Sequence, residues 1–530
     1  MTTLVGTGAL VRLALRRDRI LLPAWIGVFV LYAASSAGAS IGLYPTVESR
    51  VALGTSSNAN PSLLALYGWV FDPTSLGAIS LYKLVALGAA MVAVLTIIVT
   101  VRHTRAEEET GRLELIGATV VGRYAPLAAA LIVSFGTSLV LGVLSAVGLM
   151  SPGLPATGSL AFGLGWAATG MVFAAVAAVA AQLTAGARTA TGIAMAVLGG
   201  AYLIRAVGDS TGTDGPTWVS WLSPLGWPAQ VRPFAGDRWV VLLLPLACTA
   251  ALCVAAFALV ARRDMGAGLL PDRRGPARAS AGLSSPLALA ARLQRGALVG
   301  WTVGFMVAGL VFGGIAANVG SMADSQQARD MITKLGGQQG LTDAFMATEM
   351  GFVAMIAAAY GIQAAMRLRS EETALRAEPV LAASVSRTSW ALSHLVFALA
   401  GTAFLLVVAG LTAGLSYAAA TDFSQFGRVL GAALAQLPAA MVLTGIAFAA
   451  FGLVPQYSVV GWAALAGFVA IGLVGPILGL DQWVLDISPF THTPKLPGTA
   501  FTATPLVWLV LAAAAGIAAG FAGLRRRDIV

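Results

Sequence analysis

Two segments of this chain carry the same six charged side chains at the same spacing, although only 10% of its 530 residues are charged. Residues 105–123 read RAEEETGRLELIGATVVGR and residues 369–387 read RSEETALRAEPVLAASVSR; at an offset of 264 both fit R-x-E-E-x3-R-x-E-x8-R. The shared positions are Arg105, Glu107, Glu108, Arg112, Glu114 and Arg123 in the first segment, and Arg369, Glu371, Glu372, Arg376, Glu378 and Arg387 in the second. Glutamates and arginines in such clusters form charge-assisted hydrogen bonds. We call these segments the first elbow and the second elbow, and each is a place where a partner could bind.

The elbows lie between long apolar segments. The chain is 58% hydrophobic, with a mean hydropathy of +0.84. Apolar runs of about 18 residues or more cross a bilayer as helices, because lipid cannot satisfy free backbone groups. The sequence predicts twelve such helices, at 20–42, 80–101, 124–150, 160–183, 189–206, 239–261, 298–319, 346–366, 389–415, 429–453, 458–479 and 503–523.

The basic residues predict the orientation of these helices. Arg12, Arg16, Arg17 and Arg19 precede the first apolar segment, and most of the 32 lysines and arginines fall in the segments on that same side. Because cytoplasmic loops are enriched in Lys and Arg, we expect both termini in the cytoplasm. The net charge of +9 then reflects the Lys and Arg residues that fix the orientation of the helices, and we expect no nucleic-acid partner.

Further repeats divide the chain into two halves. A basic stretch with a tryptophan precedes or opens the first apolar segment of each half, and an Arg-Arg-Asp triplet ends each half. The matched positions are Arg16, Arg19 and Trp25 with Arg292, Arg295 and Trp301, and 262–264 with 526–528. We therefore predict an all-α membrane protein: six helices in 1–264, a cytoplasmic linker at 265–284, and six helices in 285–530. Six is an even number, so the halves are parallel repeats about a pseudo-twofold axis. Each half should begin with an amphipathic helix in the membrane interface.

Within each elbow, the spacing suggests local ion pairs on a short exposed helix. Glu108 and Arg112 are four residues apart, as are Glu372 and Arg376, and i,i+4 pairs of this kind stabilise helices. The alternative is a solvated turn at the lipid headgroups. The recurrence of all six charges favours a surface that binds a partner.

Catalytic and nucleotide-binding motifs are absent from the sequence. It contains no G-x4-G-K-[ST] phosphate loop, no HExxH and no CxxC. A G-x-S-x-G run at 38–42 lies in an apolar helix, without the strand and turn that a nucleophile requires. We expect neither an enzyme activity nor a metal site in this chain, and any ATP hydrolysis must occur in another subunit.

With these features, the sequence resembles the type-2 class of ATP-binding-cassette exporter permeases. It is most similar to the fused twelve-span form described as exporters of polyketide antibiotics, including tetronasin-resistance permeases of actinobacteria. The elbows EEETGRLELIGATVVGR and EETALRAEPVLAASVSR and the six-plus-six layout carry the resemblance.

The resemblance implies that each elbow is a cytoplasmic coupling helix that docks on an ATPase subunit. It implies two copies of that separate ATPase, which would hold ATP and Mg2+, a hydrophobic small-molecule cargo, and a bacterial inner membrane as the location. The charged elbow positions become the candidate docking residues. The second elbow departs from the first, because Leu375 replaces Gly111 and Pro379 replaces Leu115, so the two docking surfaces are expected to differ.

Charged residues near the predicted helices suggest one further site. Lys83 and Glu349 lie near the outer ends of corresponding helices, and we consider a contact between them that closes an outer gate. The alternative is that each side chain extends separately to the headgroups. Arg205 and Asp209, four residues apart, are expected to pair locally.

Two other functions stay open. A proton-coupled drug transporter also has six plus six parallel helices, but it requires a buried carboxylate or histidine relay that the sequence does not suggest. A membrane enzyme acting on lipid-linked substrates would require a positioned acid or base. The candidates for that acid or base are the aspartates expected in outer loops: Asp209, Asp214, Asp237, Asp481 and Asp486.

Overall fold

The computed structural model describes residues 3–117, 120–211, 217–264, 266–270, 277–319, 338–457, 459–474 and 481–528. All regular structure in these residues is helical. Contacts divide the chain into two compact units, Met1–Gly275 and Pro276–Val530. The boundary falls inside the predicted linker at 265–284.

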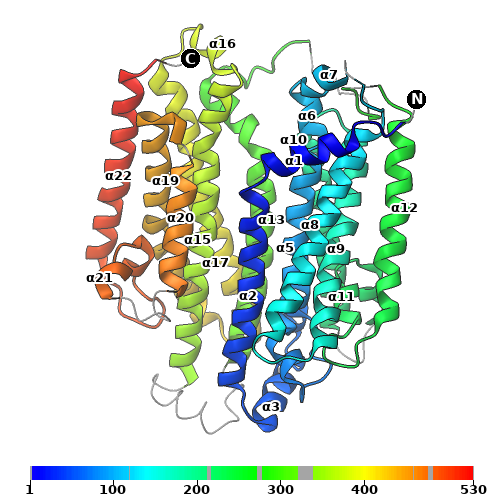
Figure 1. Cartoon of the computed structure of the whole chain (residues 1–530). Coiled ribbons are helices and arrows are strands. Elements are labelled where there is room, and N and C mark those ends of the chain that lie inside the picture. The colour runs from blue at the N-terminus through cyan, green and yellow to red at the C-terminus, as the bar shows by residue number, and fades with distance from the viewer. Residues whose placement is uncertain are drawn as a thin grey trace. The chain divides into compact units, whose positions relative to one another are not determined.

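The described part of unit 1 consists of six long helices connected by shorter ones. Its elements are α1 Thr7–Arg17, α2 Leu21–Leu43, α3 Val47–Asn58, α4 Pro61–Tyr67, α5 Leu76–Arg102, α6 Arg105–Glu109, α7 Arg112–Gly117, α8 Ala125–Met150, α9 Ala156–Leu183, α10 Ala187–Ser210, η1 Thr217–Leu222, α11 Trp227–Gln230, η2 Trp239–Leu242 and α12 Leu243–Val260. Figure 1 shows α1 lying across its neighbours, whereas α2 runs along them.

Unit 2 is built from α13 Pro286–Val319, α15 Gln338–Thr373, α16 Ala377–Leu381, α17 Arg387–Ala420, η4 Phe423–Gln425, α18 Phe426–Ala435, α19 Leu437–Leu453, η5 Pro455–Tyr457, α20 Val460–Val474, α21 Gln482–Leu485, η6 Pro489–His492 and α22 Ala503–Arg526. In both units the helices that flank the elbow are long and central (Figure 1).

Eleven stretches in the described residues are long and apolar enough to cross a membrane. They coincide with eleven of the twelve predicted helices. The remaining one, predicted at 458–479, corresponds to the shorter α20, while Ser458 and 475–480 lie outside the described residues.

Small residues bring the helices close together. In unit 1, a Cβ at Gly142 would collide with the carbonyl oxygen of Gly163, so α8 and α9 meet backbone to backbone. In unit 2, a Cβ at Gly452 would collide with the Gly520 carbonyl oxygen, so α19 and α22 meet in the same way. Without a hydrophobic driving force in lipid, such close van der Waals contact holds helices together.

The amphipathic helix predicted at the start of each half is a separate helix, α1, in unit 1, whereas in unit 2 the basic stretch is the beginning of the continuous helix α13. Its location in the membrane interface stays a prediction. In unit 1 the chain breaks after α1 at Asp18, whose buried carboxylate lies 2.6 Å from His103 Nε2 and 3.2 Å from Arg102 Nη2. The matching position in unit 2 is the neutral Gln294, which lies inside the continuous helix α13. These contacts at the end of α5 thus hold the chain in a turn, whereas α13 continues through the matching position.

Candidate functional site

The first elbow follows directly from the end of α5. A turn at His103 and Thr104 leads into α6, and Gly111, at φ +70°, leads from α6 into α7. This path buries Arg105 completely, while Glu109, Arg112 and Glu114 are exposed. The charges of the elbow therefore divide into an inner and an outer group.

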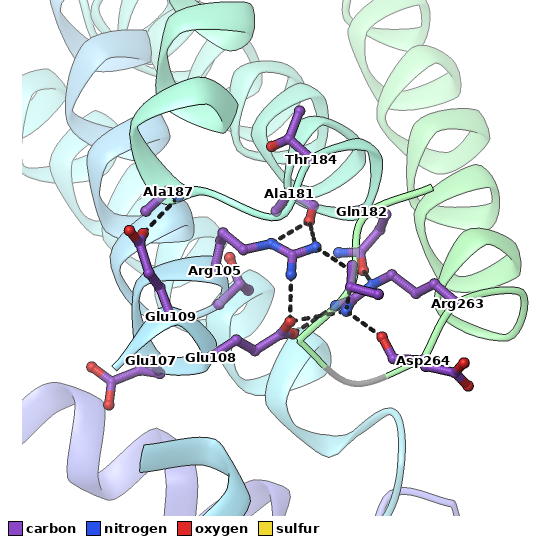
Figure 2. A network of polar contacts seen from close by, with 12 residues as sticks. Arg105, Glu107, Glu108, Glu109, Ala181, Gln182, Thr184, Ala187, Arg263 and Asp264 are labelled. Carbon is purple, nitrogen blue, oxygen red and sulfur yellow. Dashed lines mark hydrogen bonds and ion pairs between the residues drawn. The ribbon is translucent and has the colours of Figure 1, made fainter. Parts of the chain in front are cut away.

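Glu108 is the centre of the inner group (Figure 2). Its carboxylate accepts from Arg105 Nη1 at 2.7 Å and from both terminal nitrogens of Arg263, at 2.6 and 2.9 Å. A two-pronged arginine–carboxylate contact of this kind is strong and fixes geometry. It joins the elbow to the end of the last helix of the unit, because Arg263 follows α12 closely.

Backbone carbonyls and side-chain amides complete this network. Arg105 Nε donates to the Ala181 carbonyl at 2.9 Å, and Arg263 Nε donates to Gln182 Oε1 at 2.7 Å, both at the end of α9 (Figure 2). Glu109 accepts from the Ala187 N–H, at the start of α10, at 2.9 Å. The first elbow is thus tied to the ends of α9, α10 and α12.

The second elbow repeats the central contact. Glu372 accepts from Arg527 Nη1 at 2.5 Å and Nη2 at 3.0 Å, and Arg369 Nη1 lies 3.5 Å from the same carboxylate. Arg527 follows α22, the last helix of unit 2, and its guanidinium lies 4.8 Å from the centre of the Phe451 ring. We call the paired contacts Glu108–Arg263 and Glu372–Arg527 the elbow clasps.

The last charged position of each elbow supports the clasp. Arg123 Nη2 donates to the carbonyls of Val260 and Arg263, both at 2.9 Å. Arg387 Nη1 donates to the carbonyl of Arg527 at 2.9 Å. Each arginine therefore satisfies carbonyls at the end of a helix, which otherwise lack donors.

The predicted i,i+4 pairs are wrong. Arg112 lies 3.7 Å from Glu107, not against Glu108, and Arg376 lies 3.1 Å from Glu371, not against Glu372. The physical reason is that the turns before α7 and α16 break the helix between the two expected partners.

Glu107 and Glu371 have second partners that differ between the units. Glu107 contacts Arg17 of α1, and burial together with repulsion from Arg102 and Arg112 lowers the pKa of Arg17. Glu371 lies 2.7 Å from Arg367 in its own helix. The first elbow is thus also tied to α1, whereas the second is not.

The turn geometry is the same in both elbows despite the change in sequence. Leu375 has φ +57°, close to the +70° of Gly111. A leucine in this left-handed region costs about 1 kcal/mol or more, so the fold of the second elbow imposes the turn. Pro379 lies within α16, near its first turn, where proline is tolerated.

The outer group of each elbow faces away from the protein. The Arg112 and Arg376 side chains are 55% and 56% exposed, and Glu114 and Glu378 are exposed beside them. A cavity of about 390 Å3 opens next to the first elbow, lined by Leu113, Arg123, Leu127 and Val260 among others. These four charges, on α7 and at the start of α16, are the elbow charges most accessible to a partner.

Sequence reasoning did not find Arg263 and Arg527 as partners of the elbows. It treated their triplets as stop signals at the ends of the halves. The signal was present, because Arg263 and Arg527 are separated by the same 264 residues as Glu108 and Glu372.

Lys83 and Glu349 belong to different units, and their contact stays a prediction. Lys83 is exposed, with its ammonium 5.7 Å from the ring centres of Tyr67 and Tyr82. Glu349 is partly buried in α15. The local Arg205–Asp209 pair is confirmed, at 3.3 Å.

Within each unit, the outer aspartates that the structure describes make separate local contacts or are exposed. Asp209 is occupied by Arg205 and Ser220, Asp237 accepts from the Phe234 N–H, and Asp486 accepts from Gln482. Asp481 is exposed, and Asp214 lies outside the described residues. In the part of the chain that the structure describes, no three His, Cys, Asp or Glu side chains are placed to hold a metal ion.

Fold and site together define a helical membrane protein with two charged elbows, each held to the end of the last helix of its unit. A family model described as "Multidrug efflux system permease Rv1217c, C-terminal domain" matches residues 9–260 and 283–525. The chain is also 45% identical to the multidrug efflux system permease protein Rv1217c of Mycobacterium tuberculosis (strain ATCC 25618 / H37Rv). That similarity extends over 528 residues, 99% of this chain and 95% of that protein. The chain therefore belongs to the Rv1217c-like family of multidrug efflux permeases.

Proposed function

We propose that this chain is the membrane subunit of an ATP-driven exporter of the type-2 ATP-binding-cassette class, related to polyketide-antibiotic exporters of the tetronasin-resistance kind. It moves hydrophobic or amphipathic small molecules, including antibiotics, out of the cell. The observation that carries the proposal is the same elbow clasp in both units, next to exposed charges on α7 and α16. The family relationship and the lack of a phosphate loop in the sequence support it.

In this proposal the chain has twelve spans in two parallel repeats, with both termini and both elbows in the cytoplasm. The excess of Lys and Arg on the elbow side supports that orientation. The helices α7 and α16 are the coupling helices, and each receives one copy of a separate ATPase subunit. ATP and Mg2+ bind to those partner subunits.

The structure changes which elbow residues we assign to docking. Glu108 and Glu372 are turned inward and already paired, so the docking surface consists of Arg112 and Glu114 in the first elbow and Arg376 and Glu378 in the second. The inner residues have another role: they make each elbow rigid against the end of α12 or α22.

The clasps provide a physical path from ATPase to permease. When ATP-driven closure of the ATPases displaces α7 and α16, each clasp moves the end of its unit's last helix with the elbow. A buried two-pronged ion pair transmits such a displacement because breaking it leaves uncompensated charges. Alternating access then follows from the movement of both units.

The test is co-purification of this chain in detergent with the ATPase encoded beside it, followed by measurement of the complex mass. We expect one permease with two ATPases. Reversal of one elbow (R112E with E114R, or R376E with E378R) should leave one ATPase, and reversal of both should leave none.

The matched control is R262E with R526E. Both arginines are exposed, they are also 264 residues apart, and they lie at the same ends of the units without joining the clasps. This control should retain two ATPases. A permease that purifies alone and moves cargo on a proton gradient would instead support a secondary transporter.

A further inference from the structure

The two units differ most at their loop ends, opposite the elbows. Before its last helix each unit carries W-V-x3-S-P, at Trp218–Pro224 and at Trp483–Pro489, an offset of 265. In unit 1, Ser223 Oγ donates to the Ala201 carbonyl at 2.6 Å and accepts from the Leu225 N–H at 3.1 Å. In unit 2, the matching Ser488 is 1% exposed, and its hydroxyl has no hydrogen-bond partner among the described residues.

A buried ion-pair cluster fixes the loop in unit 1. Arg205 is fully buried, contacts Asp209, and donates to the carbonyls of Ala65 and Leu66. Ser220 Oγ lies 2.5 Å from Asp209 Oδ1, which joins the loop to α10. The positions 265 residues later are Ala470, Val474 and Leu485, which cannot make these contacts.

A cavity of about 630 Å3 lies beneath the corresponding loop of unit 2. Its apolar wall includes Phe352 and Met355 of α15, with Leu485 and Phe490 from the loop. This volume is in the range of sites for drug-sized molecules.

The polar part of the wall is unusual for a membrane helix. Gln436 is 2% exposed and interrupts a membrane-spanning stretch between α18 and α19, next to Pro438. Its side-chain carbonyl has no hydrogen-bond partner among the described residues. Unpaired buried polar atoms cost roughly 1–3 kcal/mol, so two of them in one wall require an explanation.

A cation completes the wall. Lys495 lines the cavity and is exposed, and no ion pair with it occurs in the part of the chain that the structure describes. The wall therefore presents an apolar surface, a carbonyl that requires a donor, a buried hydroxyl and a positive charge.

We propose that this cavity binds an amphipathic organic anion, with its apolar body against Phe352 and Phe490, a donor group on Gln436 and its acidic group near Lys495. The proposal rests on the proposed function only in identifying the ligand as exported cargo at an exit-side subsite. Binding itself requires no ATPase, so it can fail while the exporter assignment stands.

The test uses the full chain in phosphatidylcholine nanodiscs without ATPase, titrated with dansylaminoundecanoic acid. This fluorescent probe has an apolar chain, a sulfonamide donor and a carboxylate. We expect saturable binding that weakens about fivefold in Q436L, from loss of one buried hydrogen bond. K495E should weaken binding about tenfold, while the methyl ester of the probe should bind wild type and K495E equally.

Controls separate this site from non-specific binding and from misfolding. S223A removes the matched serine of unit 1, outside the cavity, and should leave the Kd unchanged. K495E changes an exposed residue, so its fold should be intact. Equal Kd values for wild type, Q436L and K495E would overturn the proposal and indicate a water-filled cavity. Displacement of the probe by phosphatidylglycerol in the nanodisc would also overturn it, because the occupant would then be a membrane lipid.

Discussion

The elbow ends of the two units are alike, and their loop ends are not. At the elbow end, a glutamate just after the second long helix (Glu108) or in its last turn (Glu372) pairs with an arginine after the last helix of the same unit. At the loop end, unit 1 has the buried Arg205–Asp209–Ser220 cluster, whereas the matching positions of unit 2 are Ala470, Val474 and Leu485. The comparison teaches that the elbow ends share one contact, whereas the loop ends carry different side chains at matched positions.

The clasps themselves differ in their surroundings. Around Glu108, both Arg105 and Arg263 are nearly inaccessible, with side chains 0% and 8% exposed. Around Glu372, the Arg369 side chain is 30% exposed and Arg527 stacks on Phe451. The arginines around the first clasp are therefore the more deeply buried, although the Glu372 side chain, 2% exposed, is buried at least as fully as that of Glu108, 7% exposed.

The largest expected effect is a difference between E108Q and E372Q. E108Q leaves two buried arginines without their counter-charge, which should cost about 3–5 kcal/mol. E372Q should cost about 1–3 kcal/mol, since Arg369 reaches solvent and Arg527 keeps the Phe451 ring. Thermal midpoints of the detergent-purified variants measure this difference.

A double variant isolates the pairing. R263Q added to E108Q removes one of the unpaired charges, and it should restore part of the lost stability. If E372Q lowered the thermal midpoint as much as E108Q, the difference in burial between the clasps would not govern their stability.

The next largest loss of stability is expected from a substitution at the loop end of unit 1. D209N leaves the buried Arg205 guanidinium with backbone carbonyls and the Tyr202 ring but no counter-charge, and we expect a loss of about 2–3 kcal/mol. The control is D486N in the loop of unit 2, where the aspartate is exposed and bonded to Gln482; its effect should stay within about 0.5 kcal/mol. Equal effects would show that the loops are held alike.

Much of the fold was predictable because lipid imposes strong rules on sequence. The apolar segments predicted at 124–150 and 503–523 correspond to Ala125–Met150 and Ala503–Arg526. Where helices run beyond the apolar core, as α15 does to Thr373, polar residues continue the helix into water and hydropathy alone cannot find the end.

The clasps were less predictable, because sequence does not say which helix ends meet. Local spacing suggested Glu108 with Arg112, but the turn at Gly111 places them on different helices and leaves Glu108 to Arg263. The break after α1 depends in the same way on contacts between Asp18 and the end of α5. Identifying these long-range charge pairs required the three-dimensional structure. The sequence offered one indication of them, because Glu108 and Arg263 recur together 264 residues later as Glu372 and Arg527.

A smaller effect should distinguish the arginines that end the elbows. R123A removes donors to two carbonyls at the end of α12, and R387A removes a donor to one carbonyl after α22. We expect losses of about 1–2 and about 0.5–1 kcal/mol, respectively. Hydrogen–deuterium exchange should show the last turn of α12 fraying more in R123A than the last turn of α22 does in R387A.

The smallest effect gives the sharpest comparison of the loop ends, because the same substitution is made at matched serines. S223A removes a buried hydroxyl with two hydrogen bonds and leaves the Leu225 N–H without its acceptor, which should cost about 1–2 kcal/mol. S488A removes a buried hydroxyl that has no partner among the described residues, so the thermal midpoint should stay unchanged or rise slightly. A loss in S488A equal to that in S223A would mean that Ser488 has a bonding partner in the folded protein. In that case the matched serines hold their loops alike, and the asymmetry between the loop ends rests on the Arg205–Asp209–Ser220 cluster of unit 1 alone.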